Sequence, residues 1–323
     1  MHSHCTLRSV GNPLGGRAIY HVATVDWAFA DEPGPPSERS SGLARQVLVG
    51  PQQGAVHTEL AVGAFAPGGW LQRHVHSFEE GLYVLAGELL LEHDGTVHRL
   101  VAGDFALMPI GLWHALGNGG EEPVSWLSVN TPVRLAPDAG RKDTLFAREP
   151  FDLAAFAARA QRPPFGSPTL RWIGHYDGTP PQTEALRVDD PARGRKPAGM
   201  DTALLAYSGI SVKMLVDRAF GADLLTMFTV DYEPGGAAQA HDHPFEETYF
   251  FVSGQIEAEL DGRPYTLRAG DVVFAGVGSV HGFYNTGSER VRWIETQAPQ
   301  PPGRHAYRWS ATWTTFEEEN DVE

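Results

Sequence analysis

Residues 234–285 read PGGAAQAHDHPFEETYFFVSGQIEAELDGRPYTLRAGDVVFAGVGSVHGFYN, and this stretch decides the fold of the chain. It holds two histidines two residues apart, a glutamate four residues later and a final histidine further on: His241, His243, Glu247 and His281. On a β-strand, residues two apart point to the same face, so the first three side chains can share one face. Three imidazoles and a carboxylate suit a divalent metal such as Fe, Mn, Ni, Co or Zn.

The same pattern occurs earlier in the chain, at residues 67–118. The corresponding side chains are those of His74, His76, Glu80 and His114. Every member precedes its counterpart by 167 residues, and no gap is needed between the two copies. A repeat of this length indicates two copies of one domain, each with a complete set of candidate ligands.

A short turn signal lies before the last histidine of each copy. Asp94-Gly95 and Asp261-Gly262 supply it, and Asp-Gly is a strong signal for a tight hairpin between two strands. The final ligand therefore comes from a different strand than the first three. Ligands on non-adjacent strands converge when the sheet curls, as it does in a small barrel. The residues thus predict an all-β fold.

Each copy resembles the cupin double motif, in which G-x5-HxH-x3-E-x6-G is followed by G-x5-PxG-x2-H-x3-N. Besides the ligands, the matching residues are Gly87, Gly103, Pro109, Gly111, Asn118, Gly254, Gly270, Gly278 and Asn285. In the second copy, Gly276 stands where the motif has proline. The chain is similar to a bicupin over both halves. This resemblance implies an all-β class with two tandem double-stranded β-helix (jelly-roll) barrels and a few short helices.

The repeat and the resemblance together predict the order of the domains. We expect an N-terminal extension, a first barrel, a connection, a second barrel and a C-terminal tail, at residues 1–42, 43–132, 133–205, 206–300 and 301–323. The connection is rich in proline, glycine and charged residues, which form loops rather than a core. Within it, FDLAAFAARA at 151–160 predicts a short amphipathic helix.

Composition limits the partners of the chain. The 323 residues carry a net charge of −15, whereas nucleic acids and anionic membranes attract basic surfaces. No apolar run approaches the roughly 20 residues of a membrane helix, and the N-terminus lacks an apolar signal-peptide core. A single cysteine, Cys5, fits a reducing compartment. We expect a cytoplasmic protein with a small-molecule substrate, no nucleic acid and no membrane, and the resemblance implies a homo-oligomer.

The resemblance also implies one divalent transition metal for each ligand set, and so up to two per chain. Fe(II) is the expected metal, with Mn(II) or Ni(II) as alternatives, because imidazole-rich sites accept several first-row metals. A carboxylate beside open metal positions can accept a proton from a bound hydroxyl. Glu80 and Glu247 are therefore the candidate catalytic bases as well as candidate ligands.

Strand alternation predicts which side chains face each candidate site. In the second copy these are Tyr249, Phe251 and Phe283, which are expected to flank a planar or apolar substrate. Aromatic residues at these positions could equally fill the interior of a barrel. Gln72 and Gln239 lie two residues before the first histidine of each set. Either glutamine could bind a metal-bound oxygen, or it could cap the end of a barrel.

The expected function is that of a metal-dependent oxidoreductase. The chain resembles bicupin dioxygenases such as quercetinases. Two complete sets of three histidines and one glutamate, together with an aromatic second pocket, favour a dioxygenase that cleaves an enolic or aromatic small molecule. The alternative is a cupin hydrolase, lyase or isomerase.

Two other bicupin families represent this alternative. Ureidoglycine aminohydrolases are similar, but they place Glu and Gln where this chain has His241 and His281. Oxalate decarboxylases are similar in having two complete sites, but the Ser-Glu-Asn lid of that family is not found in this sequence. A storage or ligand-binding bicupin is the non-enzymatic alternative, and two complete ligand sets argue against it.

Overall fold

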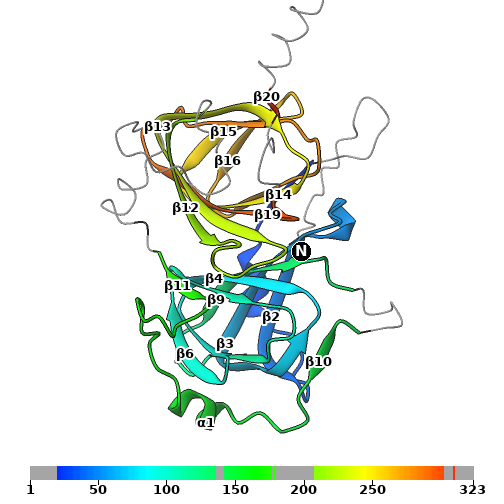
Figure 1. Cartoon of the computed structure of the whole chain (residues 1–323), viewed down its shortest axis with the longest axis vertical. Coiled ribbons are helices and arrows are strands. Elements are labelled where there is room, and N and C mark those ends of the chain that lie inside the picture. Colours follow the sequence, from blue (N-terminus) through cyan, green and yellow to red (C-terminus); the bar gives the residue numbers. More distant parts are fainter. Residues whose placement is uncertain (1–19, 136–141, 177, 179–206, 302–307, 310–323) are drawn as a thin grey trace, which may run out of the picture.

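The computed structural model describes residues 20–135, 142–176, 178, 207–301 and 308–309. Two sheets account for most of these residues, and each curls into a barrel (Figure 1). The barrel of the N-terminal half, blue to green, lies below the barrel of the C-terminal half, yellow to orange. The predicted all-β class with two tandem barrels is confirmed. In the part of the chain that the structure describes, no helix has the length and hydropathy needed to cross a membrane.

The two barrels share one topology. The first contains β2 to β9, at Ser40–Val49, Glu59–His76, Glu79–Ala86, Glu88–His93, Thr96–Val101, Asp104–Met108, His114–Gly117 and Val124–Thr131. The second contains β12 to β19, at Tyr207–Val216, Thr226–Asp242, Glu246–Ser253, Gln255–Leu260, Arg263–Arg268, Asp271–Ala275, His281–Tyr284 and Val291–Ala298. The orders β7-β4-β9-β3-β8-β5-β6 and β17-β14-β19-β13-β18-β15-β16 correspond strand by strand. The repeat in the sequence is therefore a repeat in the structure.

The predicted hairpin turns connect β5 to β6 and β15 to β16. Asp94 and Asp261 have φ angles of 49° and 47°, and the glycine after each is also at positive φ. A two-residue hairpin turn with both central residues at positive φ matches the twist of the strands it joins. The prediction of an Asp-Gly hairpin in each copy is confirmed.

Segments outside the repeat add strands to both barrels. β1 (Tyr20–Thr24) precedes the first barrel in sequence but pairs with β17 of the second. β11 (Ile173–His175) precedes the second barrel but pairs with β7 of the first. Each barrel therefore takes an edge strand from the segment that leads into the other barrel. β1 lies within the expected N-terminal extension, and the predicted domain boundaries stay predictions.

The other added elements are short. β10 (Thr144–Phe146) pairs with β3, and β20 (Arg308–Trp309) pairs with β13. The helical elements are η1 (Trp27–Asp31), η2 (Pro51–Gln53) and α1 (Leu153–Ala158). α1 confirms the predicted helix and packs on the first barrel, where Phe156 shares a buried apolar cluster with Leu90 and Val97. Much of the predicted connection and tail, including 179–206 and 310–323, lies outside the described residues.

One apolar core joins the two barrels. It contains Leu60, Val62, Leu107 and Leu127 from the first barrel together with side chains of the second, among them Leu225, Met227, Phe250 and Phe274. All of these side chains are at most 3% exposed. Burying large aliphatic and aromatic side chains contributes roughly 1.5–3 kcal/mol each. The two barrels are therefore held against each other by a shared core.

Two carboxylates at this interface make equivalent contacts in opposite directions. Glu79 of β4 accepts hydrogen bonds from the backbone N–H groups of Asp223, Leu224 and Leu225, at 2.6, 2.8 and 3.1 Å. Glu246 of β14 accepts them from Val56, His57 and Thr58, at 2.7, 2.9 and 3.1 Å. Each carboxylate therefore holds a loop of the opposite barrel, and it immediately precedes a candidate metal ligand in sequence.

These contacts predict a measurable loss of stability. Glu79→Gln should lower the free energy of unfolding by about 2 kcal/mol, since hydrogen bonds to a charged group contribute about 1.5–3 kcal/mol each. Glu246→Gln should behave alike. The matched control is Glu88→Gln, which removes a half-exposed ion pair with Arg99 and should cost under about 1 kcal/mol. Guanidinium unfolding measures all three variants, and equal effects for Glu79 and Glu88 would contradict the assignment.

Candidate metal centres

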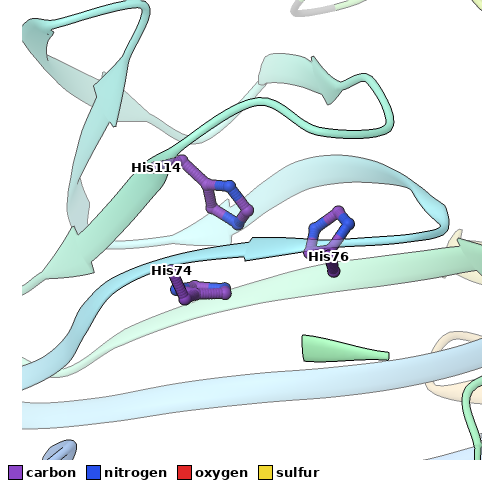
Figure 2. A group of neighbouring side chains, drawn as sticks. All are labelled: His74, His76 and His114. Atoms are coloured by element: carbon purple, nitrogen blue, oxygen red, sulfur yellow. The ribbon is translucent and has the colours of Figure 1, made fainter. Parts of the chain in front are cut away.

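The first barrel brings its four candidate ligands together. β3 carries His74 and His76, β4 carries Glu80, and β8 carries His114. The ring centroid of His114 lies 4.1 Å from that of His74 and 4.8 Å from that of His76. Figure 2 shows the three rings turned toward one another. Available nitrogens of these rings lie within 4.8 Å of one another, as the ligands of one metal ion require.

Hydrogen bonds fix which nitrogen of each ring is available. The Nδ1 atoms of His74, His76 and His114 lie 2.8, 2.6 and 3.0 Å from backbone carbonyl oxygens of residues 72, 78 and 112. A carbonyl oxygen accepts, so each Nδ1 carries the hydrogen. In the neutral ring, Nε2 then keeps a lone pair, which is the form that binds a metal.

Burial keeps this site in the metal-binding form. Burial lowers the pKa of His74 to about 4 and holds the pKa of His114 well below its usual value. The Nε2 atoms of His76 and His114 are buried and have no hydrogen-bond partner within the protein. A buried acceptor without a partner costs free energy. A bound cation would satisfy both nitrogens, so these residues fit a divalent metal.

Glu80 completes the cluster from a separate strand, β4. Its Oε2 atom lies 3.4 Å from Nε2 of His76 and 3.7 Å from Nε2 of His114. Its Oε1 atom accepts a hydrogen bond of 2.6 Å from the Ser128 hydroxyl. Burial alone would raise the pKa of Glu80, but the two imidazoles and Ser128 outweigh burial and hold the pKa below its usual value. Glu80 is therefore an anion, ready to bind a cation.

A cavity of about 250 Å³ opens beside this cluster. It is lined by three members of the cluster, His74, His76 and Glu80, and by Leu43, Arg45, Gly63, Leu71, Phe78, Leu116, Trp126, Ser128, Asn130, Arg134, Thr144 and Phe146. Apolar atoms make up most of the surface of its wall, which is typical of a pocket for a small organic molecule. The space is large enough for one aromatic ring with its substituents.

Two arginines give one part of this cavity a positive charge. Arg45 pairs with Glu59 at 2.6 Å, while the guanidinium of Arg134 lies 5.7 Å from the centre of the Phe78 ring. Burial lowers the pKa of Arg45, Glu59 raises it and the nearby Arg134 lowers it again. Two cations thus face one cavity with a single nearby carboxylate besides Glu80. The arrangement favours an anionic ligand.

The second barrel brings the donor atoms of His243, Glu247 and His281 within 4.8 Å of one another, and the ring centroid of His241 lies 4.4 Å from that of His281. Nδ1 of His241, His243 and His281 lies 2.7, 2.8 and 2.9 Å from backbone carbonyl oxygens. Oε2 of Glu247 lies 2.6 Å from Nε2 of His243 and 3.2 Å from Nε2 of His281. Gln297 donates a 2.7 Å hydrogen bond to the other oxygen of Glu247. This donor set likewise fits a divalent metal.

The space beside the second cluster is far smaller, at about 10 Å³. Larger side chains replace those of the first barrel at the 167-residue offset. Val230 stands for Gly63, Tyr249 for Leu82 and Phe283 for Leu116, whereas the smaller Val212 replaces Arg45. Tyr249, Phe251 and Phe283 pack together in one buried cluster. The second barrel therefore has a filled interior and lacks the counterpart of Arg45.

These positions bear on the predicted substrate residues. Tyr249, Phe251 and Phe283 face the barrel interior and are at most 2% exposed, so they fill the space that a ligand would need in this structure. Their role beside a substrate stays a prediction. Gln72 is buried and donates to the backbone oxygens of Ala147 and Glu149, at 3.0 and 2.8 Å, which fastens the segment after β10. Gln239 is exposed.

Sequence reasoning missed the polar side chains of the first cavity. Ser128 and Asn130 lie two and four residues after Trp126 on β9, so alternation along that strand could have found them. Arg45 follows Leu43 by two residues on β2 and shows the same signal. Arg134 lies beyond the end of β9. No periodic pattern in the sequence marks its position.

Comparisons with known proteins agree with this architecture. The cupin domain family matches residues 61–130 and 228–296. SchB from Streptomyces halstedii is 31% identical over 118 residues, covering 36% of this chain and 84% of SchB. Gentisate 1,2-dioxygenase from a Ralstonia species is 37% identical over 71 residues, covering 22% of this chain and 20% of that enzyme.

A solved structure is similar over most of the chain. Salicylate 1,2-dioxygenase from Pseudaminobacter salicylatoxidans superposes with a TM-score of 0.63 at 16% identity. The match covers 87% of this chain and 84% of that protein, so both barrels take part. At 16% sequence identity, this similarity shows a shared fold alone. The chain therefore belongs to the cupin superfamily and is a bicupin, with one cupin domain in each half.

Proposed function

We propose that this chain is a metal-dependent dioxygenase that cleaves an enolic or aromatic carboxylic acid in the first barrel. The observation that carries the proposal is the cavity of about 250 Å³, which joins a cluster of three histidines and a glutamate to two arginines. A ligand that fits it needs a group that binds metal, an apolar body and an anionic group. A hydroxylated or enolic carboxylic acid has all three.

The arginines would hold the carboxylate of the substrate. Arg side chains bind carboxylates through charge-assisted, often bidentate hydrogen bonds. Arg134 has the freer guanidinium for this task, because Arg45 already pairs with Glu59. The rings of Phe78, Trp126 and Phe146 would enclose the body of the substrate and exclude water. The substrate would thereby be oriented with its hydroxyl toward the histidine cluster.

The histidine cluster and Glu80 would carry the chemistry. His74, His76, His114 and Glu80 would hold the metal, which supplies Lewis acidity and, as Fe(II), access to dioxygen. Glu80 would accept the proton of the substrate hydroxyl, since its carboxylate is ionised and lies within the cluster. Ser128 would keep the Glu80 side chain in place through its hydrogen bond to Oε1.

The similarity to known proteins supports this choice of reaction. Two of the similar proteins are named as dioxygenases of gentisate and salicylate, which are hydroxylated aromatic acids. An apolar cavity with two arginines fits compounds of this class. The residues of the first cavity and the names of similar proteins therefore support the same class of substrate independently.

The test is oxygen uptake by protein purified without oxygen and analysed for metal. The proposal predicts about two metal ions per chain from the two ligand sets and oxygen consumption with one or more hydroxybenzoates or enolic acids. The matched esters should be inactive, since they lack the anionic group. Manganese together with oxygen-independent release of carbon dioxide would favour the decarboxylase alternative instead.

Arg134 offers a sharper prediction. Arg134→Ala should weaken binding of the carboxylic acid by roughly 10- to 100-fold, since a hydrogen bond to a charged group is worth about 1.5–3 kcal/mol. The affinity for the matched ester should not change. Arg263→Ala, on β16 of the other barrel, is the control. Calorimetric titration measures each case, and an equal loss for acid and ester would contradict a role in carboxylate binding.

A further inference from the structure

We propose that the Tyr249 hydroxyl is an additional metal ligand in the second barrel, which makes that barrel a closed metal centre rather than a second active site. The proposal concerns a different barrel from the proposed reaction, and it stands whatever the first barrel catalyses. Tyr249 is a polar side chain beside the second ligand set. The first barrel has Leu82 at the equivalent position.

The position of Tyr249 carries the proposal. Its hydroxyl contacts the Oε2 atom of Glu247 and lies 2.9 Å from Nε2 of His281. Oε2 of Glu247 lies 2.6 Å from Nε2 of His243 as well. The phenol oxygen therefore sits among the same atoms that the sequence motif provides for a metal. It projects from β14, two residues after Glu247, on the same face of the strand.

The donor atoms around the Tyr249 hydroxyl suit a bound cation. The Nδ1 atoms of His243 and His281 bond to the carbonyl oxygens of Phe245 and Ser279, so the Nε2 atoms of both rings face Glu247. Glu247 adds a carboxylate oxygen. The tyrosine hydroxyl brings one hydrogen, which cannot lie along its contacts to Glu247 and His281 at once. A divalent cation at the centre would attract all four atoms, and the phenol proton would leave to solvent as the oxygen binds.

The surroundings hold Tyr249 in this position. Its ring centroid lies 4.9 Å from that of Phe283 and 6.1 Å from that of Trp293. Trp293 in turn donates a 2.9 Å hydrogen bond to Glu295, which adjoins Glu247. With about 10 Å³ of space, the cavity has room for at most one water molecule. A closed ligand shell is typical of structural metal sites, whereas catalytic sites keep an open position.

The test uses iron and visible absorption, because tyrosine bound to ferric iron gives a charge-transfer band in the visible region. The full-length His74→Ala/His114→Ala double variant, which loses two candidate ligands of the first barrel, is loaded with Fe(II) and then oxidised. Tyr249→Phe is introduced into this background. Tyr265→Phe is the matched control, since Tyr265 lies in the same barrel and bonds to Tyr20 instead.

The proposal predicts about one iron per chain in the double-variant background, as expected for the second ligand set alone. It also predicts a visible band that Tyr265→Phe retains and Tyr249→Phe loses, even where iron remains bound. Iron binding without a band, or a band that survives in Tyr249→Phe, would overturn it. So would a second barrel that binds no iron at all. Circular dichroism and iron content show that each variant is folded and loaded.

Discussion

Turnover of the carboxylic acid is expected to fall about a thousandfold or more when His76 or His114 is replaced by alanine. Loss of a metal ligand removes several kcal/mol of transition-state stabilisation, and each 1.36 kcal/mol is about tenfold in rate. His243→Ala and His281→Ala should remove the metal of the second barrel but change turnover by less than about tenfold. The asymmetry follows from the cavities, which measure about 250 and about 10 Å³.

The control for this prediction is His98→Ala. His98 is also a buried histidine of the first barrel, at 5% exposed, and it is not among the side chains that line the cavity. Its loss should change stability rather than the metal content. Steady-state kinetics and elemental analysis on the five variants separate the two barrels. A loss of turnover in His243→Ala as large as in His114→Ala would contradict the assignment of the reaction to the first barrel.

Closing the first cavity is expected to abolish substrate binding while the metal stays bound. Gly63 allows Trp126 to lie close to β3, since a Cβ atom at Gly63 would lie 2.4 Å from the Trp126 ring. Gly63→Val copies Val230 of the second barrel and should push Trp126 into the cavity. Valine suits a strand, so the backbone can accept it. We expect affinity to fall by more than about 100-fold, or about 2.7 kcal/mol.

Gly63→Ala is a milder version of the same change. Its smaller side chain should displace Trp126 less and weaken binding less, with an iron content equal to that of the wild-type chain. Thermal unfolding reports how much stability either change costs, which is expected to be about 1–3 kcal/mol for an overpacked core. Unchanged affinity in a folded, metal-loaded Gly63→Val variant would show that substrate does not bind in this cavity.

The fold was predictable because the two copies share spacing as well as identity. His74 and His76 lie two residues apart on one strand, so they face one way, and Asp94-Gly95 forms a hairpin. Both features are local in sequence. The exchange of β1 between halves was not predictable, because a five-residue strand can pair with either barrel edge. That choice depends on contacts hundreds of residues apart.

The amount of free space inside each barrel could not be predicted from the sequence pattern either. Alternation correctly placed Tyr249 and Phe283 on the inner face of the second barrel. It could not determine whether those rings line a cavity or fill it, because free space depends on side-chain volumes from several strands at once. Gly63 and Val230 lie on β3 and β13, just before the motif in each copy, and they help to set this difference.

The most direct test of the account is anomalous diffraction from crystals of the iron-loaded chain, grown without oxygen and soaked with a hydroxybenzoate. The account predicts an anomalous peak at each histidine cluster, and density for the ligand in the first barrel, with its carboxylate at Arg134. Ligand density at His243 and His281 in the second barrel, with the first cavity vacant in the same crystal, would contradict it.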